Sequence, residues 1–137
     1  MPSHPLDHVA VAVHSIEESR ALFELVTGKP CSPVEKLPSQ GVDVAFVGSV
    51  ELLEPREPDT PVGRFLERNG PGLHHVAFRV PGLERALEEF ERRGLRVVDE
   101  GIRTGARGHR VAFLHPASTG KVLVELVEES STAGAPP

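Results

Sequence analysis

The chain repeats one stretch of its own sequence, and this repeat constrains the fold more than any other feature. Residues 73–91, LHHVAFRVPGLERALEEFE, align with residues 6–24, LDHVAVAVHSIEESRALFE, at a shift of 67 positions. The alignment places His8 on His75. The chain is therefore a duplication of one module.

The two copies also match at their ends, but the second copy is longer. Val50–Leu53 resembles Val124–Val127 only at a shift of 74, so about seven extra residues fall between 115 and 121 and predict a wider turn. Each module thus opens with a strand that carries a His and closes with a strand that carries a Glu, Glu51 or Glu125. A pseudo-twofold arrangement of the modules would gather four ligands for a divalent cation, namely His8, Glu51, His75 and Glu125.

Length and repeat together predict one domain made of two modules. A chain of 137 residues fits one compact domain, and two copies of roughly 65 residues would each be marginal alone. We expect a single domain over 1–128, with modules at about 6–55 and 73–128 joined by a short helix at 61–69. The small, polar, Pro-ended tail, 129–137, is expected to be disordered.

Composition excludes several classes of partner. The net charge is −5 with acidic and basic residues interspersed, which gives no basic field for nucleic acid and no polybasic patch for a membrane. No apolar run approaches the ~18 residues of a membrane span. Cys31 is the only cysteine, so no internal disulfide and no thiolate zinc site is possible. A cytoplasmic location is the expectation.

In the first module, residues 6–13 alternate as a strand does, with His8 on a face of small residues. A half-buried His with no ligand role is the alternative for this position. A helix begins at Ser15 and ends at Gly28, and we expect it to be structural. Strands are predicted near Val34, over Val42–Val47 and over Val50–Leu53. The helix is expected to pack through an apolar stripe, formed by Ala21, Leu22, Leu25 and Val26.

The second module predicts the same order of elements. A helix over 82–93 presents Leu83, Ala86, Leu87 and Phe90 at helical spacing. Strands are expected over 95–98, 111–114 and 122–127. The Gly-rich basic loop 101–110 suits an anionic group such as a phosphate or carboxylate, although a flexible solvated hairpin explains it equally well.

Several segments resemble the vicinal oxygen chelate superfamily, and within it the methylmalonyl-CoA epimerases. They are LDHVAVAV, QGVDVAFV, VELLEP with the following DTPVGRFLE, GLHHVAFRV, GARGHRVAFLHP and GKVLVELVE. The resemblance covers nearly the whole chain. It implies an α+β fold of two tandem βαβββ modules that form a curved mixed sheet around a central metal cavity.

The resemblance also implies an activity and a set of site residues. It places the metal on His8, His75 and Glu125 with Glu51 at the fourth position. The metal is most often Co2+, with Mn2+, Ni2+, Zn2+ and Mg2+ as alternatives. The implied reaction interconverts the 2R and 2S forms of methylmalonyl-CoA through a metal-stabilised enolate, with Glu125 and Glu51 as catalytic carboxylates in a homodimer.

The sequence departs from the family at one point. Some members have a second acid/base glutamate in the strand after Gln40-Gly41, where this chain has Val-Asp-Val-Ala. The second proton carrier therefore stays open between Gln40, Asp43, His115 and a metal-bound water. The candidate substrate-binding residues are Gln40, Arg107, His109 and His115.

Other functions of the same fold remain alternatives. A glyoxalase I-like lactoylglutathione lyase uses a similar metal site, but its thiol-conjugate pocket is not visible in this sequence. A metal-free protein that binds a small molecule would not need four ligand positions. An extradiol dioxygenase, with two His and one carboxylate on iron, is the weakest alternative.

Overall fold

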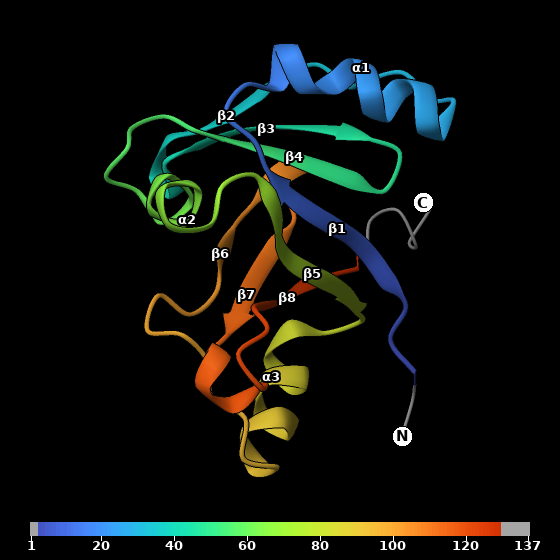
Figure 1. Cartoon of the computed structure of the whole chain (residues 1–137). Helices are drawn as coiled ribbons and strands as arrows, with labels where there is room; N and C mark the ends of the chain where they lie inside the picture. Colours follow the sequence, from blue (N-terminus) through green and yellow to red (C-terminus); the bar gives the residue numbers. More distant parts are fainter. Residues whose placement is uncertain (1–2, 130–137) are drawn as a thin grey trace. The chain divides into compact units, whose positions relative to one another are not determined.

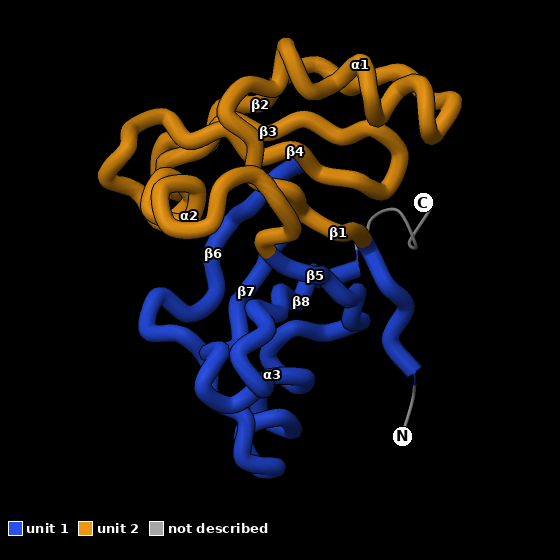
Figure 2. Tube along the Cα trace, viewed as in Figure 1, with its two compact units in different colours: residues 1–7, 75–137 blue, residues 8–74 orange. Residues whose placement is uncertain are grey.

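The computed structural model describes residues 3–129; positions 1–2 and 130–137, which hold most of the tail expected to be disordered, lie outside the described part. The chain divides into two compact units, coloured separately in Figure 2. Unit 1 comprises residues 1–7 and 75–137, and unit 2 comprises residues 8–74.

Unit 2 carries the first module. Its strands follow the order β2-β3-β4-β1, in which β1 and β4 are parallel and the other neighbours are antiparallel. The strand β1 begins two residues before the unit does. The elements are β1 (Leu6–Ala12), α1 (Ile16–Thr27), β2 (Glu35–Leu37), the 3-10 helix η1 (Pro38–Gln40), β3 (Val42–Val47), β4 (Val50–Pro55) and α2 (Pro61–Asn69).

Unit 1 repeats this topology with the second module. Its order is β5-β8-β7-β6, with β5 and β8 parallel and the remaining neighbours antiparallel. The α+β class and the two βαβββ modules expected from the sequence are confirmed. The elements are β5 (Gly72–Val80), α3 (Leu83–Arg92), β6 (Arg103–Thr104), η2 (Ala106–Gly108), β7 (Arg110–Leu114), η3 (Pro116–Ser118) and β8 (Val124–Glu128).

In each unit the long helix, α1 or α3, packs on one face of the strands. The polar residues of interest, Glu51 and Glu125, lie on the opposite face. Figure 1 shows α1 along β3 and β4, and these elements are in contact. The apolar cluster under α1 contains Val13, Ile16, Ala45, Val47 and Leu52. Because successive side chains of a strand point to opposite faces, Glu51 lies on the face turned away from α1.

The α3 side of unit 1 is built in the same way. Leu83 and Leu87 of α3 are buried against Ala112, Leu114 and Leu126 of the strands. Ala86 and Phe90 pack against the same cluster, so the apolar stripe predicted for this helix is confirmed. Glu125, next to Leu126 in the strand, lies on the opposite face.

The packing face predicted for α1 is wrong. The helix occupies the expected residues, with Ser15 capping the Glu18 amide and Gly28 closing it at φ 72°. However, Leu22, Leu25 and Val26 are 59%, 82% and 73% exposed, and Ala21 is exposed as well. The side of α1 that packs on the strands is instead the one with Ile16 and Phe23, which lie in the apolar cluster. The Ile16 amide also donates to Glu54 Oε1 (2.8 Å).

The strand predicted over residues 95–98 of unit 1 is also displaced in the structure. Residues 95–98 make only one isolated bridge, between Val97 and Leu114. The strand β6 instead lies inside the loop predicted for 101–110, where Arg103 pairs with Val111. The wider turn expected between 115 and 121 is confirmed: it contains η3, and Lys121 has φ 72°.

Across residues 3–129, the helices are all too short or too polar to cross a membrane. The longest helix, α1, has 12 residues.

Candidate metal and active site

Unit 2 brings His8 and Glu51 together on neighbouring parallel strands. Ala10 of β1 is in register with Glu51 of β4, and His8 lies two residues earlier on the same face. His8 Nε2 and Glu51 Oε1 are 3.1 Å apart, and both residues are buried, with 4% and 5% exposure. A buried carboxylate is costly unless it is paired or bound to a cation. The solvated alternative for Glu51 is therefore excluded.

Unit 1 repeats this arrangement with His75 and Glu125. Ala77 of β5 is in register with Glu125 of β8, as Ala10 is with Glu51. His75 Nε2 and Glu125 Oε1 are 3.0 Å apart, and both residues are buried. The two modules thus build the same His–Glu pair from equivalent positions.

A phenylalanine ring contacts the histidine of each His–Glu pair. No role for these phenylalanines was predicted from the sequence. Phe46 is directly opposite Glu51 in the β3–β4 register, and its ring meets that of His8 edge-on at 5.5 Å. Phe113 is opposite Glu125 and meets His75 at 5.2 Å. The repeat could have identified these two residues, since the shift of 67 aligns Phe46 with Phe113. Each ring limits the orientations open to its imidazole.

The geometry within each pair suits ligands of one ion. Two ligand atoms at adjacent corners of an octahedron, each about 2.1 Å from the metal, are roughly 3 Å apart. The Nε2–Oε1 separations of 3.1 and 3.0 Å have this value. Imidazole nitrogen and carboxylate oxygen are donors that first-row divalent metals accept. The residues present therefore fit a divalent metal.

The two strands that carry Glu51 and Glu125, β4 and β8, also contact the start of the long helix of their own module. The Ile16 amide at the start of α1 donates to Glu54, and the Leu83 amide at the start of α3 donates to Glu128 at 3.0 Å. We call these two contacts the helix latches. Each latch glutamate stands three residues after the glutamate of its His–Glu pair, and so on the opposite face of the same strand.

The structure narrows the choice of a second proton carrier. Asp43 is in register with Glu54 and so lies on the α1 face of the strands, away from Glu51. Its carboxylate accepts from Arg56 Nη1 at 2.7 Å. On the Glu51 face, β3 presents Phe46, and further along only apolar valines. Asp43 is therefore a poor candidate.

Gln40 and His115 lie at the ends of short helices in different units. Gln40 is the last residue of η1 and is half-buried. His115 precedes η3, where its Nδ1 accepts from the Ala117 amide at 3.1 Å. A neutral His115 consequently carries its proton on Nε2.

The basic loop of unit 1 is tied down by contacts inside the unit. Arg107, at φ 60°, donates Nη2 to Asp7 at 3.3 Å, and Arg79 Nε donates to the same carboxylate at 3.1 Å. His109 is half-buried and follows η2. The loop joins the antiparallel strands β6 and β7, and the contacts with Asp7 connect it to the rest of unit 1.

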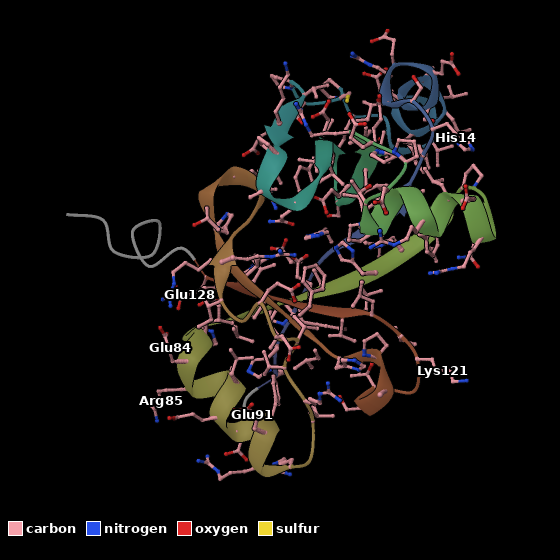
Figure 3. The ribbon with its side chains drawn as sticks, turned by 90° about the vertical axis from the view of Figure 1, so that its left-hand side faces the viewer. His14, Glu84, Arg85, Glu91, Lys121 and Glu128 are labelled. Atoms are coloured by element: carbon pink, nitrogen blue, oxygen red, sulfur yellow. The ribbon has the colours of Figure 1, made fainter. Side chains whose placement is uncertain are left out.

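The remaining arginines of the loop are engaged as well. Arg103 lies over the ring of Phe113, 6.0 Å from its centroid. Arg110 bonds Glu128 and also Glu84, and Figure 3 labels these two glutamates near the start of α3. The hydrogen bond from Arg110 lowers the pKa of the Glu84 carboxyl. The loop therefore supports the Glu128 helix latch.

Comparison with known proteins places this architecture in a family. Residues 7–113 match the glyoxalase/bleomycin resistance protein/dioxygenase superfamily. The uncharacterized protein YqjC of Bacillus subtilis is 42% identical over 127 residues, covering 90% of this chain and 91% of that protein. The mitochondrial methylmalonyl-CoA epimerase of Bos taurus is 40% identical over 126 residues, covering 88% and 72%.

A solved structure agrees with these relatives. A variant of Streptomyces coelicolor methylmalonyl-CoA epimerase, in complex with 2-nitronate-propionyl-CoA, superposes with a TM-score of 0.86 at 30% identity, covering 94% of this chain and 97% of that one. The chain belongs to the glyoxalase/bleomycin resistance protein/dioxygenase superfamily and, within it, to the methylmalonyl-CoA epimerase family. The resemblance noted in the sequence is confirmed.

Proposed function

We propose that this chain is a metal-dependent epimerase that interconverts the (2R) and (2S) forms of methylmalonyl-CoA. One observation carries the proposal: a buried His–Glu pair occurs at equivalent positions in both units. The relatives supply the substrate class, since they include a methylmalonyl-CoA epimerase and a complex with an acyl-CoA analogue.

The two His–Glu pairs are proposed to hold a single divalent cation. Two imidazoles and two carboxylates form a hard-to-borderline donor set, for which Co2+ is our first choice, ahead of Mn2+, Ni2+, Zn2+ and Mg2+. A bound cation supplies Lewis-acid polarisation of the substrate oxygens, which lowers the pKa of the α-carbon proton. The ligands are His8, Glu51, His75 and Glu125.

The proton itself is handled by the carboxylates of the chain. Glu125 accepts the α-proton, and the electron pair of the broken C–H bond is delocalised into the thioester carbonyl. A proton delivered to the opposite face of the α-carbon then gives the other epimer. Glu51, the buried carboxylate at the equivalent position, is the other catalytic carboxylate of the proposal, and Gln40, His115 and a metal-bound water are the alternatives for the second proton carrier. Ala10 and Ala77 are the residues in register with the two glutamates.

Exchange of the substrate α-proton tests this proposal. Protein loaded with Co2+ is incubated with methylmalonyl-CoA in D2O, and loss of the α-proton signal is followed by NMR beside a metal-stripped sample. Metal-dependent exchange is expected. Glu125→Gln should slow it by at least ~100-fold, as loss of a general base does. Glu129→Gln, an exposed position just after β8, serves as the matched control and should not change the rate.

Two outcomes would overturn parts of the proposal. If metal binds but no exchange occurs, the substrate is wrong, and the hemithioacetal of a glyoxalase I-like lyase is the next compound to assay. If no divalent metal binds, the metal centre is wrong and a metal-free binding protein becomes the better description.

Three further expectations belong to this proposal. They are that the two modules share one core as a single domain, that the protein works as a homodimer, and that it is located in the cytoplasm.

A further inference from the structure

Arg103 differs from the other arginines of the basic loop because it has no carboxylate partner. Arg107 donates to Asp7, and Arg110 donates to the two glutamates near the start of α3. Within residues 3–129, Arg103 takes part in no ion pair, and its guanidinium lies over the ring of Phe113, 6.0 Å from the ring centroid. The fold therefore leaves the positive charge of this side chain uncompensated.

The strand register places this guanidinium on the face of unit 1 that carries the His–Glu pair. Arg103 of β6 is in register with Val111 of the neighbouring strand β7 (Figure 1), and Phe113 lies two residues further on the same face. Phe113 is in turn opposite Glu125 of β8, and its ring meets that of His75 at 5.2 Å. One aromatic ring thus contacts both Arg103 and the proposed metal ligand His75.

The surface around Arg103 on this face is apolar. Its register partner Val111 forms a buried cluster with Ala77 and Val127, and these side chains offer the guanidinium no acceptor. The Phe113 ring replaces water on one side of the group, and the attraction between a cation and an anion increases where water is excluded. A guanidinium in this setting suits an oxyanion that presents two oxygens, because it can bind both through paired hydrogen bonds.

The first module provides an internal control for this position. Val44 is the counterpart of Val111 at the shift of 67. Its register partner on β2 is Glu35, which thus occupies in unit 2 the place that Arg103 has in unit 1. The two His–Glu pairs are equivalent, but the charge at this strand position is opposite. A basic residue here is therefore not a requirement of the βαβββ module.

We propose that Arg103 binds an anionic oxygen group of the acyl-CoA substrate. This inference rests on the proposed function, which supplies the substrate. Methylmalonyl-CoA carries two kinds of such group, the free carboxylate of its acyl part and the phosphates of CoA, and a guanidinium binds both kinds in the same way. Because only one module has a basic residue at this position, the charge gives the duplicated ligand set a single direction for the substrate.

Calorimetric titration of the Co2+-loaded protein with three probes tests the proposal. The probes are malonyl-CoA, propionyl-CoA, which lacks the free carboxylate, and malonyl-pantetheine, which lacks the phosphates. Arg103→Gln should raise the dissociation constant of malonyl-CoA about 10- to 100-fold, as the loss of a hydrogen-bonded charge pair does. Arg85→Gln, the same change at an exposed position on the outward side of α3 (Figure 3), is the matched control and should leave it unchanged.

The other two probes identify the group that Arg103 binds. If it binds the carboxylate, Arg103→Gln weakens malonyl-pantetheine as well but not propionyl-CoA. If it binds a phosphate, the variant weakens propionyl-CoA but not malonyl-pantetheine. Unchanged binding of all three probes, or an equal loss for all three, overturns the inference and leaves the proposed function standing. A wild-type protein that binds neither CoA compound overturns the proposed function and this inference with it.

A second variant separates the charge of Arg103 from its packing on Phe113. Arg103→Met keeps a long apolar side chain against the ring but removes the positive charge. It should lose as much affinity for malonyl-CoA as Arg103→Gln, and it decides the matter if circular dichroism shows that Arg103→Gln misfolds. A folded Arg103→Met variant that binds malonyl-CoA as tightly as wild type overturns the proposal, because packing alone would then be the role of this residue.

Discussion

The Glu128 helix latch predicts a large stability loss from one substitution on the protein surface. Glu128 accepts from the Leu83 amide at 3.0 Å, and its side chain is 21% exposed. The N-cap of α3 is Gly82, which has no side-chain acceptor. Glu128→Ala therefore leaves the first amide of the helix without its acceptor.

The size of the effect follows from this one hydrogen bond. A bond to a charged acceptor contributes about 1.5–3 kcal/mol, so we expect Glu128→Ala to lower the free energy of unfolding by ~2 kcal/mol. The ion pair between Glu128 and Arg110 is screened by solvent, so its loss adds little to the change in the free energy of unfolding. For a chain of this length the melting temperature should fall by roughly 6–8 °C. Glu128→Gln keeps an oxygen acceptor without the charge and should cost about half as much.

Urea denaturation followed by circular dichroism measures this loss. Metal must be removed by chelation beforehand, because a bound ion would stabilise the folded state of every variant. Glu129→Ala, one residue further and exposed, is the matched control and should stay within about 0.5 kcal/mol of wild type. A Glu128→Ala variant equally close to wild type would refute the latch.

Three other substitutions test separate features. Gly63→Ala should destabilise the folded state by about 1–3 kcal/mol, because the added methyl group would press on backbone oxygens that precede α2. Gly72→Ala is the control, since its methyl group would meet no atom within 4 Å. Thermal unfolding compares the two variants. The pKa of Glu24 is lowered by its hydrogen bond from arginine, so its stabilising contribution is present above the unfolded pKa and is lost as pH falls through the folded value. Glu24→Gln should thus lower the urea midpoint at pH 7 but not at pH 2, and an equal deficit at both would contradict this assignment. His8→Ala should weaken Co2+ binding about a hundredfold or more in a calorimetric titration, while His109→Ala should not.

The parts of the site that were predictable from the sequence are those that depend on local periodicity and on the repeat. Alternation along residues 6–13 predicted the face on which His8 lies, and β1 has that alternating burial. The shift of 67 then predicted the equivalent position of His75. Both steps need only the period of a strand and the equivalence of two modules.

Other features depended on contacts between residues distant in sequence. The apolar stripe of α1 is present at helical spacing, but the helix packs through Ile16 and Phe23, against strand residues that are distant in sequence. Likewise, the β-branched residues at 95–98 predicted a strand, yet only Val97 forms a bridge. In both cases the structure depends on contacts with residues distant in sequence, which local propensity does not specify.

The helix latches explain how a duplicated strand positions a site residue accurately. In β4, Glu51 and Glu54 are separated by an odd number of residues and point to opposite faces. Glu54 holds the start of α1, so the helix, packed on its own apolar cluster, fixes the position of the strand along its length. A slip by one residue would turn Glu51 into the apolar cluster and break the latch at once. The same relation between Glu125 and Glu128 in unit 1 places the second carboxylate, so each module sets its site glutamate by the same bond.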